Sequence, residues 1–167
     1  MDLLWAPWRI DFIKGKKSKK CFLCEYIKNK DVEYLLWKGN YTMVVMNKYP
    51  YNNGHLMIAP VKHKKELNQL SEKEIIELFN AIRISTEVLS RTIKPHGFNI
   101  GANLGESAGA GLPGHLHIHI VPRWNGDTNF MPVIASTKVI PQSLEQLSII
   151  LKKEFSKIRK GKYNVYR

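Results

Sequence analysis

The 167-residue chain has few acidic residues, only two cysteines and no long apolar run. No stretch approaches the roughly 18 consecutive apolar residues that cross a bilayer, so we expect no membrane-spanning helix and no membrane partner. Residues 1–20 also lack the order of a secretory signal peptide, because an acid comes first and the charges come last. These absences favour a cytoplasmic protein.

Acidic residues number 14 against 26 lysines and arginines, which gives a formal net charge of +12. Such a balance is found in ordinary soluble proteins and in proteins that bind anions such as nucleotides or nucleic acid, and charge alone does not separate the two. Five of the lysines lie within residues 14–20. That run has no helical period and no interleaved aromatics, so residues 1–20 are expected to form a solvated basic arm.

The two cysteines, Cys21 and Cys24, form a C-x-x-C pair. In a reducing compartment this spacing indicates a metal site or a redox pair more often than a structural disulfide. A thioredoxin-type pair follows a strand, whereas a lysine run precedes this one. A redox pair is therefore disfavoured, and a metal site and an unbridged structural pair both stay open.

The rest of the chain predicts one α+β domain over residues 1–167. Hydrophobic residues make up 44% of it, enough for a core. Strands are expected at 33–39, 41–47, 55–60 and 98–105, and helices at 71–94 and 143–158, each opened by a capping box. The first helix carries an apolar stripe of Ile75, Leu78, Phe79, Ile82, Leu89 and Ile93. Strands joined by short turns, with the helices set apart, favour an antiparallel sheet.

The most unusual segment is "HLHIHIV" at residues 115–121, which places a histidine at every second position. Alternation of this kind predicts a strand with the imidazoles on one face and the aliphatic side chains on the other. Two interpretations stay open. Histidines two apart on a strand can share a zinc ion, or one imidazole can act as a nucleophile beside acids and phosphate ligands.

The segments around this strand favour nucleotide chemistry. Glycines at 101, 105, 109, 111 and 114 lead into it, and glycine lets backbone N–H groups form a concave anion site. His55 opens the third expected strand and His63 lies just past its end. Strand ends commonly meet at a functional site, so these two histidines join the candidate residues.

These residues resemble the histidine triad (HIT) family, whose signature is His-φ-His-φ-His-φ-φ with φ apolar. The resemblance covers about residues 21–124. The flanking "WAPWR" and "VPRWNGDTNFMPV" look like the diadenosine tetraphosphate phosphorylase branch. It implies a HIT-like α+β fold, with an antiparallel sheet, a long amphipathic helix and a C-terminal helix. It also implies a homodimer that binds a nucleotide or dinucleoside polyphosphate, without a specific nucleic-acid partner.

The resemblance implies nucleotidyl transfer at an α-phosphate through a nucleotidyl-histidine. It makes His117 the nucleophile, and it makes His119 and His55 the phosphate-side histidines. Asn103, together with backbone groups of the loop around Gly105, would hold the α-phosphate. Asn47 matches a ribose-binding position.

One departure from the family pattern concerns the loop before the triad. Many members carry a Gly-Gln-Ser/Thr element there, whereas this chain has "GLPG" at residues 111–114, without a hydroxyl or amide side chain. Ser107 is a candidate substitute for the missing contact. Trp124, just past the triad strand, is a candidate to stack on a base or to exclude water.

The resemblance also implies a structural zinc ion. Some bacterial members hold zinc with an N-terminal C-x-x-C pair and two histidines, which match Cys21, Cys24, His63 and His115 here. This assignment leaves two triad histidines for chemistry.

We expect phosphate to be favoured over water as the acceptor of the nucleotidyl group. The alternatives are a hydrolase of dinucleoside polyphosphates or nucleoside phosphoramidates, a non-catalytic nucleotide-binding regulator, and a hydrolase with all three triad histidines on one zinc.

Overall fold

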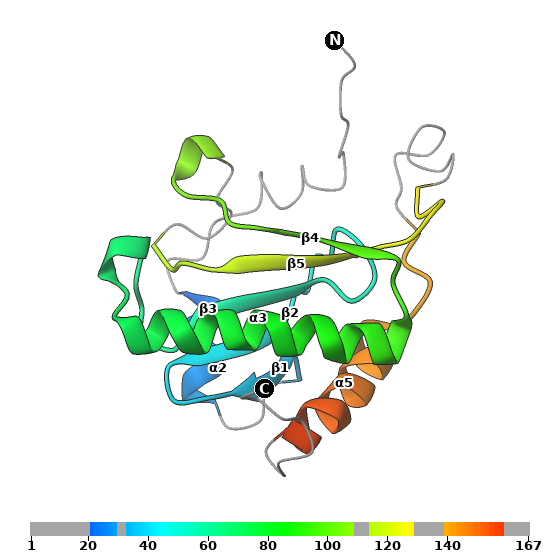
Figure 1. Ribbon diagram of the computed structural model, residues 1–167, viewed down its shortest axis with the longest axis horizontal. Coiled ribbons are helices and arrows are strands. Elements are labelled where there is room, and N and C mark those ends of the chain that lie inside the picture. Colours follow the sequence, from blue (N-terminus) through cyan, green and yellow to red (C-terminus); the bar gives the residue numbers. More distant parts are fainter. Residues whose placement is uncertain (1–20, 30–32, 109–113, 129–138, 159–167) are drawn as a thin grey trace.

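The computed structural model describes residues 21–29, 33–108, 114–128 and 139–158. Its strands form one antiparallel sheet in the order β1-β2-β3-β5-β4 (Figure 1). The strands are β1 (Leu35–Lys38), β2 (Thr42–Met46), β3 (Leu56–Pro60), β4 (Gly97–Gly101) and β5 (Ile118–Arg123). The expected α+β fold on an antiparallel sheet is confirmed.

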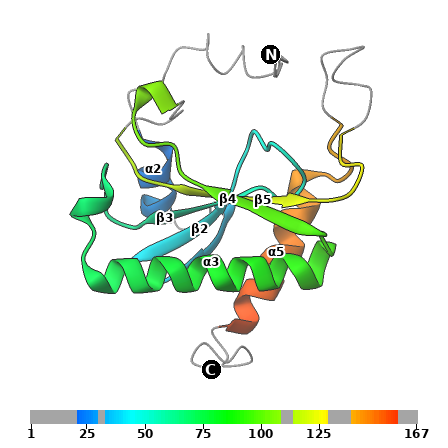
Figure 2. The ribbon, with the colours of Figure 1, turned by 45° about the horizontal axis from the view of Figure 1, so that its top comes forward.

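Helices cover both faces of this sheet. The long helix α3 (Glu72–Ile93) lies along one face, and α2 (Phe22–Lys28) lies on the other (Figure 2). The C-terminal helix α5 (Leu144–Ile158) packs beside β1 and α3. Two short 3-10 helices, η1 (Leu67–Gln69) and η2 (Glu106–Ala108), lie in the connections. None of the helices in the described ranges is both long and apolar enough to span a membrane.

The period of two in the strands separates two apolar clusters. Val44 and Met46 of β2 join the core beneath α3 and α5, whereas Met43 and Val45 face the smaller cluster beneath α2. Alternate side chains of a strand point to opposite faces of the sheet, so one strand contributes to both clusters. The face beneath α2 is also the face that carries the histidines.

Several expected boundaries are wrong. The fourth strand ends at Gly101 and not at residue 105, and β5 begins only at Ile118, so His115 and His117 precede the strand. The N-terminal caps of both long helices are present: Ser71 and Glu74 form a capping box, and the Gln146 backbone N–H donates to Ser143 Oγ.

The apolar stripe expected on α3 is wrong in part. Leu78 and Leu89 are buried, but Phe79 is 66% exposed and Ile75 is exposed as well. The buried face instead includes Ala81 and Val88, because α3 turns this side towards β2 and β3. Periodicity alone does not fix how far an apolar stripe is rotated from the sheet.

Part of the sequence interpretation lies outside the described residues. This holds for the basic arm over residues 1–20, for Gly109 and Gly111 in the glycine-rich loop, and for residues 129–138. The single domain over residues 1–167 stays a prediction.

Candidate active site and metal centre

The sheet brings His55, His117 and His119 together on the face opposite the main core. Antiparallel pairing of β3 with β5 sets His119 opposite Met57, which lies two residues after His55 and faces the α2 side. The ring centroids of His55 and His119 are 5.0 Å apart, and those of His117 and His119 are 4.9 Å apart. Ile118 and Ile120 pack into the opposite core, as the alternation predicted.

A short turn delivers His55 to this face. Gly54 has φ +71, a left-handed conformation that favours glycine, and a Cβ there would lie 2.6 Å from Ile93 Cδ1. A side chain at this position would therefore be strained and would push the turn off α3. The chain then enters β3 with the His55 ring directed towards β5, where Nε2 lies 2.9 Å from His119 Nδ1.

The hydrogen bonds of His55 determine which ring nitrogens carry protons. His55 Nδ1 accepts from the Tyr51 backbone N–H at 3.0 Å and lies 3.3 Å from Asn47 Nδ2. A nitrogen that accepts carries no proton, so neutral His55 has its proton on Nε2 and donates it to His119 Nδ1. His119 in turn has its proton on Nε2.

His117 is held in the opposite tautomer. Its Nδ1 lies 2.9 Å from the backbone carbonyl oxygen of His115, and a carbonyl can only accept. The proton of the neutral ring is therefore on Nδ1, and Nε2 keeps its lone pair. His117 is 7% exposed, so this nitrogen lies in a largely desolvated place where it can act as a nucleophile.

Burial keeps His55 uncharged. Desolvation, and then the charges of the nearby His119 and His117, together lower the pKa of His55 from 6.5 to about 3. A buried imidazole that stays neutral throughout the physiological range is a fixed hydrogen-bond donor and acceptor. His55 therefore orients His119 without competing for its proton.

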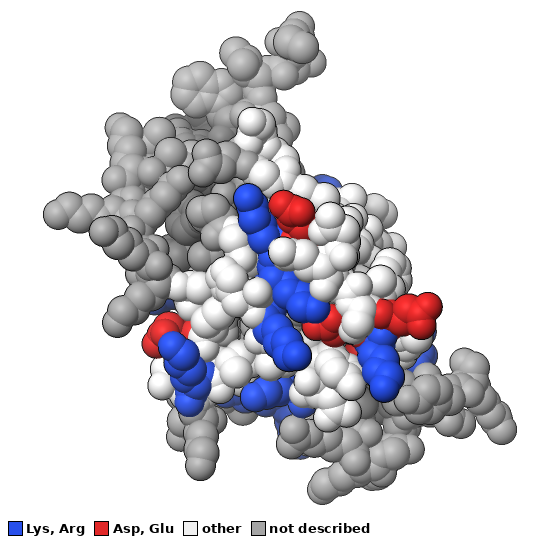
Figure 3. Space-filling view, turned by 90° about the vertical axis from the view of Figure 1, so that its left-hand side faces the viewer, with Lys and Arg blue, Asp and Glu red and all other residues white. Residues whose placement is uncertain are grey.

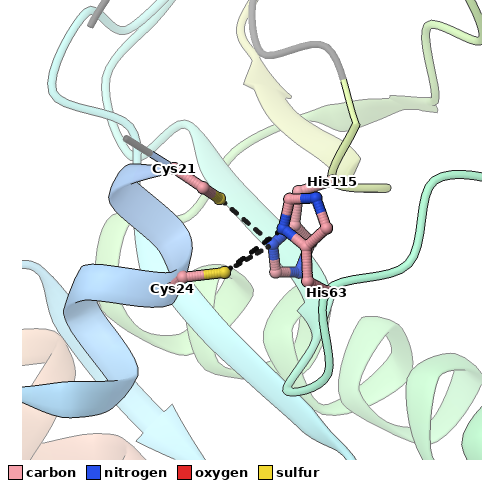
Figure 4. A group of neighbouring side chains, drawn as sticks. All are labelled: Cys21, Cys24, His63 and His115. Atoms are coloured by element: carbon pink, nitrogen blue, oxygen red, sulfur yellow. Dashed lines mark hydrogen bonds between the residues drawn. The ribbon is translucent and has the colours of Figure 1, made fainter. Parts of the chain in front are cut away.

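A second cluster lies beside the first. Cys21, just before α2, and Cys24 of α2 face the imidazoles of His63 and His115 (Figure 4). Cys21 Sγ lies 3.2 Å from His115 Nδ1, and Cys24 Sγ lies 3.3 Å from His63 Nδ1 and 3.6 Å from His115 Nδ1. All four ligand atoms lie within 4.8 Å of one another. The structure thus brings together the four residues that the sequence suggested as metal ligands.

The donor set fits a tetrahedral metal ion. Zinc bonds of about 2.3 Å to sulfur and 2.0 to 2.1 Å to nitrogen put neighbouring ligand atoms about 3.3 to 3.8 Å apart. The sulfur–nitrogen distances in the cluster are close to these values. In addition, His115 Nε2 donates to the Pro60 carbonyl at 2.9 Å, which leaves Nδ1 free as a ligand.

The thiol chemistry agrees with this fit. Burial, and then the hydrogen bond and charge of Cys21, raise the pKa of Cys24 to about 11. Two neighbouring thiolates repel each other unless a cation lies between them, and a coordinated thiol is deprotonated outright. The cluster therefore has the composition and the spacing of a cation site.

The remaining candidate residues lie further apart. Asn103 is half-buried just past β4, whereas Gly105 and Ser107 are exposed, Ser107 on η2. Asn47 Oδ1 accepts from the Tyr49 backbone N–H, so both ends of this amide are in contact with protein. The structure places Asn47 against His55.

Trp124 is not brought to the histidines. It lies at the far end of β5, five residues from His119, or about 16 Å at 3.3 Å per residue. Its indole N–H donates to the Lys94 carbonyl at the end of α3. In this chain the indole therefore supports the loop after β5.

Tyr51 is a site residue that the sequence interpretation missed. Its ring centroid lies 4.7 Å from that of His55 and 5.7 Å from that of His119. The sequence offered one indication of this role, because Tyr51 is an aromatic residue four positions before the candidate His55.

Basic side chains, with acidic ones among them, lie on the end of the molecule that contains the connection between β3 and α3. Lysines and arginines outnumber acidic residues on the face that Figure 3 shows, at the left of Figure 1. The connection between β3 and α3 lies at this end and carries the exposed Lys62 beside His63. An anionic ligand is thus attracted to the side of the sheet where the clusters lie.

Comparison with known proteins settles the family. A family model described as the HIT domain matches residues 30–126. The chain belongs to the HIT family. The AP-4-A phosphorylase of Mycobacterium tuberculosis is 38% identical over 167 aligned residues, which cover 94% of this chain and 86% of the relative.

Solved structures agree on the fold. A hypothetical histidine triad nucleotide-binding protein from Sulfolobus tokodaii is 26% identical, with a TM-score of 0.68 over 86% of this chain and 98% of that chain. A zinc-bound HIT protein from Mycobacterium smegmatis, 18% identical, has a TM-score of 0.64 over 85% of this chain and 97% of that chain. The resemblance identified in the sequence is confirmed.

Proposed function

We propose that this HIT protein is a dinucleoside polyphosphate phosphorylase that cleaves diadenosine tetraphosphate at an α-phosphate. The observation that carries the proposal is His117, whose Nδ1 donates to the His115 carbonyl and whose Nε2 is therefore unprotonated. The relative from M. tuberculosis, named as a phosphorylase of this substrate, supports the same activity. Its similarity extends over nearly the whole chain.

The first chemical step forms a nucleotidyl-histidine. His117 Nε2 attacks the α-phosphorus, a nitrogen–phosphorus bond forms, and the bond to the bridging oxygen breaks so that ATP leaves. The His119 Nε2–H donates to a phosphate oxygen, and His55 holds His119 through the 2.9 Å bond between them. The Tyr51 ring packs against both imidazoles and limits their movement.

In the second step inorganic phosphate attacks the same phosphorus. A phosphate oxygen bonds to it, the bond to His117 Nε2 breaks, and the product is ADP. The exposed Lys62 beside His63 supports an anionic acceptor because it raises the local concentration of anions. Water as the acceptor would give AMP in place of ADP.

Binding of the nucleotide is proposed for residues outside the histidine cluster. Asn103 and the backbone near Gly105 hold the α-phosphate, Ser107 contacts the next phosphate, and Asn47 contacts the ribose. Asn103, Gly105 and Ser107 follow β4, and Asn47 precedes β3. These positions support the phosphate and ribose contacts. The position of Trp124 gives less support to a contact with the base.

We further propose that Cys21, Cys24, His63 and His115 hold one zinc ion per chain. The donor set and the spacing of the ligand atoms support this. Zinc would supply a closed structural link between α2 and the segment that carries the histidines. The phosphoryl chemistry itself is left to His117, His119 and His55.

The protein is proposed to act as a cytoplasmic homodimer. The edge strand β4 exposes Ile100 (48% exposed), and α3 exposes Ile76 and Phe79. Among the described residues β4 has no strand on its outer side, and an edge strand with apolar side chains supports pairing with a second copy. Cys21 and Cys24 form no disulfide, and their thiols contact histidines. Such thiols are typical of a reducing compartment.

Product analysis tests the activity. Diadenosine tetraphosphate is supplied with and without millimolar phosphate, and nucleotides are separated by chromatography. Phosphorolysis gives ADP and ATP at a rate that rises with phosphate. If AMP dominates and the rate ignores phosphate, the protein is a hydrolase. If the nucleotide binds but no product forms, it is a binding protein.

A further inference from the structure

The peptide unit between His115 and Leu116 links the metal cluster to the nucleophile. Its carbonyl oxygen accepts the Nδ1–H of His117, and its N–H donates to the backbone carbonyl of Lys64 at 2.6 Å. The His115 ring is itself fixed between the cysteines and the Pro60 carbonyl. Any rotation of this peptide unit moves the acceptor that sets the tautomer of His117.

The loop residue Lys64 is anchored separately from the metal cluster. Its ammonium Nζ lies 2.6 Å from Glu74 Oε2 and 2.6 Å from the Gln69 carbonyl. Glu74 is buried in the first turn of α3, where its Oε2 also accepts the backbone N–H and the hydroxyl of Ser71, both at 2.7 Å. The ion pair therefore ties the loop to the rigid N-terminus of the longest helix.

We infer that Lys64 and Glu74 are positioning residues for the nucleophile His117. Their ion pair holds the Lys64 carbonyl, which holds the peptide unit at residues 115–116, which in turn keeps the His117 proton on Nδ1. Glu74 lies on α3 and Lys64 in the connection between β3 and α3, so neither belongs to the histidine face. The inference rests on the proposed function only in naming His117 as the nucleophile.

The physical reason is the weakness of one hydrogen bond. Loss of a single hydrogen bond to a neutral imidazole changes the ratio of its two tautomers about fivefold, so a displaced carbonyl lets the other tautomer, with the proton on Nε2, become populated. That tautomer has no lone pair on Nε2, the nitrogen that attacks the phosphorus. The share of His117 that can attack, and with it kcat, then falls by at most about fivefold, without any change in the groups that touch the substrate.

The test compares Lys64→Met with Lys65→Met. Both variants remove one positive charge from the same loop, so they weaken the attraction of an anionic substrate equally, but Lys65 is exposed and makes no ion pair among those of the described residues. We expect kcat of Lys64→Met to fall about fivefold with KM within about twofold of wild type. Lys65→Met should retain its kcat.

A second variant guards against misfolding. Glu74→Gln keeps an acceptor for Ser71 but removes the charge that holds Lys64, and we expect the same loss of kcat. If Lys64 and Glu74 act only through their ion pair, kcat of the double variant falls no further than kcat of Lys64→Met alone. All variants are assayed in the same zinc-supplemented buffer. Each kcat is calculated from the concentration of active sites and not from the total protein.

The decisive measurement needs no substrate. Long-range nitrogen–proton NMR of the imidazoles reports the tautomer of His117 at one fixed pH. Wild type and Lys65→Met should show the proton on Nδ1, whereas Lys64→Met should show a mixture with Nε2. An unchanged tautomer in folded Lys64→Met overturns the inference, and so does an equal loss of kcat in both lysine variants. If wild type cleaves no dinucleotide, the proposed function fails while the tautomer result still decides the positioning.

Discussion

The neutral state of His55 makes a quantitative prediction about stability. His55 is 1% exposed and lies between Tyr51 and His119, where burial lowers its pKa to about 3 from 6.5. In the unfolded chain the same imidazole is hydrated and binds a proton near pH 6.5. Between these two values the unfolded state carries one proton more than the folded state.

The sign follows from this difference. A group whose pKa is lowered by folding contributes its full stability above the unfolded value, and that stability is lost as the pH falls towards the folded value. One pH unit corresponds to about 1.36 kcal/mol per proton. From pH 7.5 to pH 5.0 the unfolded His55 titrates over about 1.5 units, so this residue alone should remove about 2 kcal/mol of the free energy of unfolding.

Urea unfolding at pH 7.5, 6.0 and 5.0 measures the effect, with His55→Gln as the comparison. Glutamine keeps a donor and an acceptor but does not titrate, so the variant should be less stable at pH 7.5 and should lose about 2 kcal/mol less than wild type on acidification. Contributions from the metal ligands are common to both proteins and cancel. Parallel pH dependences for the two proteins would show that His55 is not buried in its neutral form.

Three further predictions concern the nucleophile, the metal and the helix cap. His117→Ala should lose at least about 10³-fold in turnover but still bind nucleotide in equilibrium dialysis, and acid-quench mass spectrometry should trap no nucleotidyl-enzyme; an intermediate trapped on His119 would reassign the nucleophile. Cys24→Ser should lower both the zinc content by elemental analysis and the Tm by calorimetry, because a closed site contributes folding free energy; unchanged values for both would rule out zinc at this cluster. Ser71→Ala should lower the free energy of unfolding by about 1 kcal/mol in urea, since it removes the side-chain acceptor of the α3 cap; no loss would mean that solvent replaces the cap.

Short-range patterns in the sequence predicted which residues form the two clusters. The alternation in residues 115–121 separated the imidazoles from Leu116, Ile118 and Ile120, and the aliphatic members are buried or packed against the core. The C-x-x-C spacing, together with the resemblance, identified four residues whose ligand atoms lie together. Such patterns are readable because a strand has a fixed period of two and because a helical turn brings residues three apart to one side.

Tertiary structure alone decided which nitrogen of each imidazole is free. That choice depends on the His115 carbonyl for His117 and on the Tyr51 backbone N–H for His55. It also decided that α3 leaves Phe79 exposed and that Lys64 pairs with Glu74. The periodicity of a segment reports which side chains share a face, but not the register, rotation and loop path that select their partners. Those are set by contacts between segments far apart in the chain, since hydrogen bonds act only over about 3 Å and depend on direction.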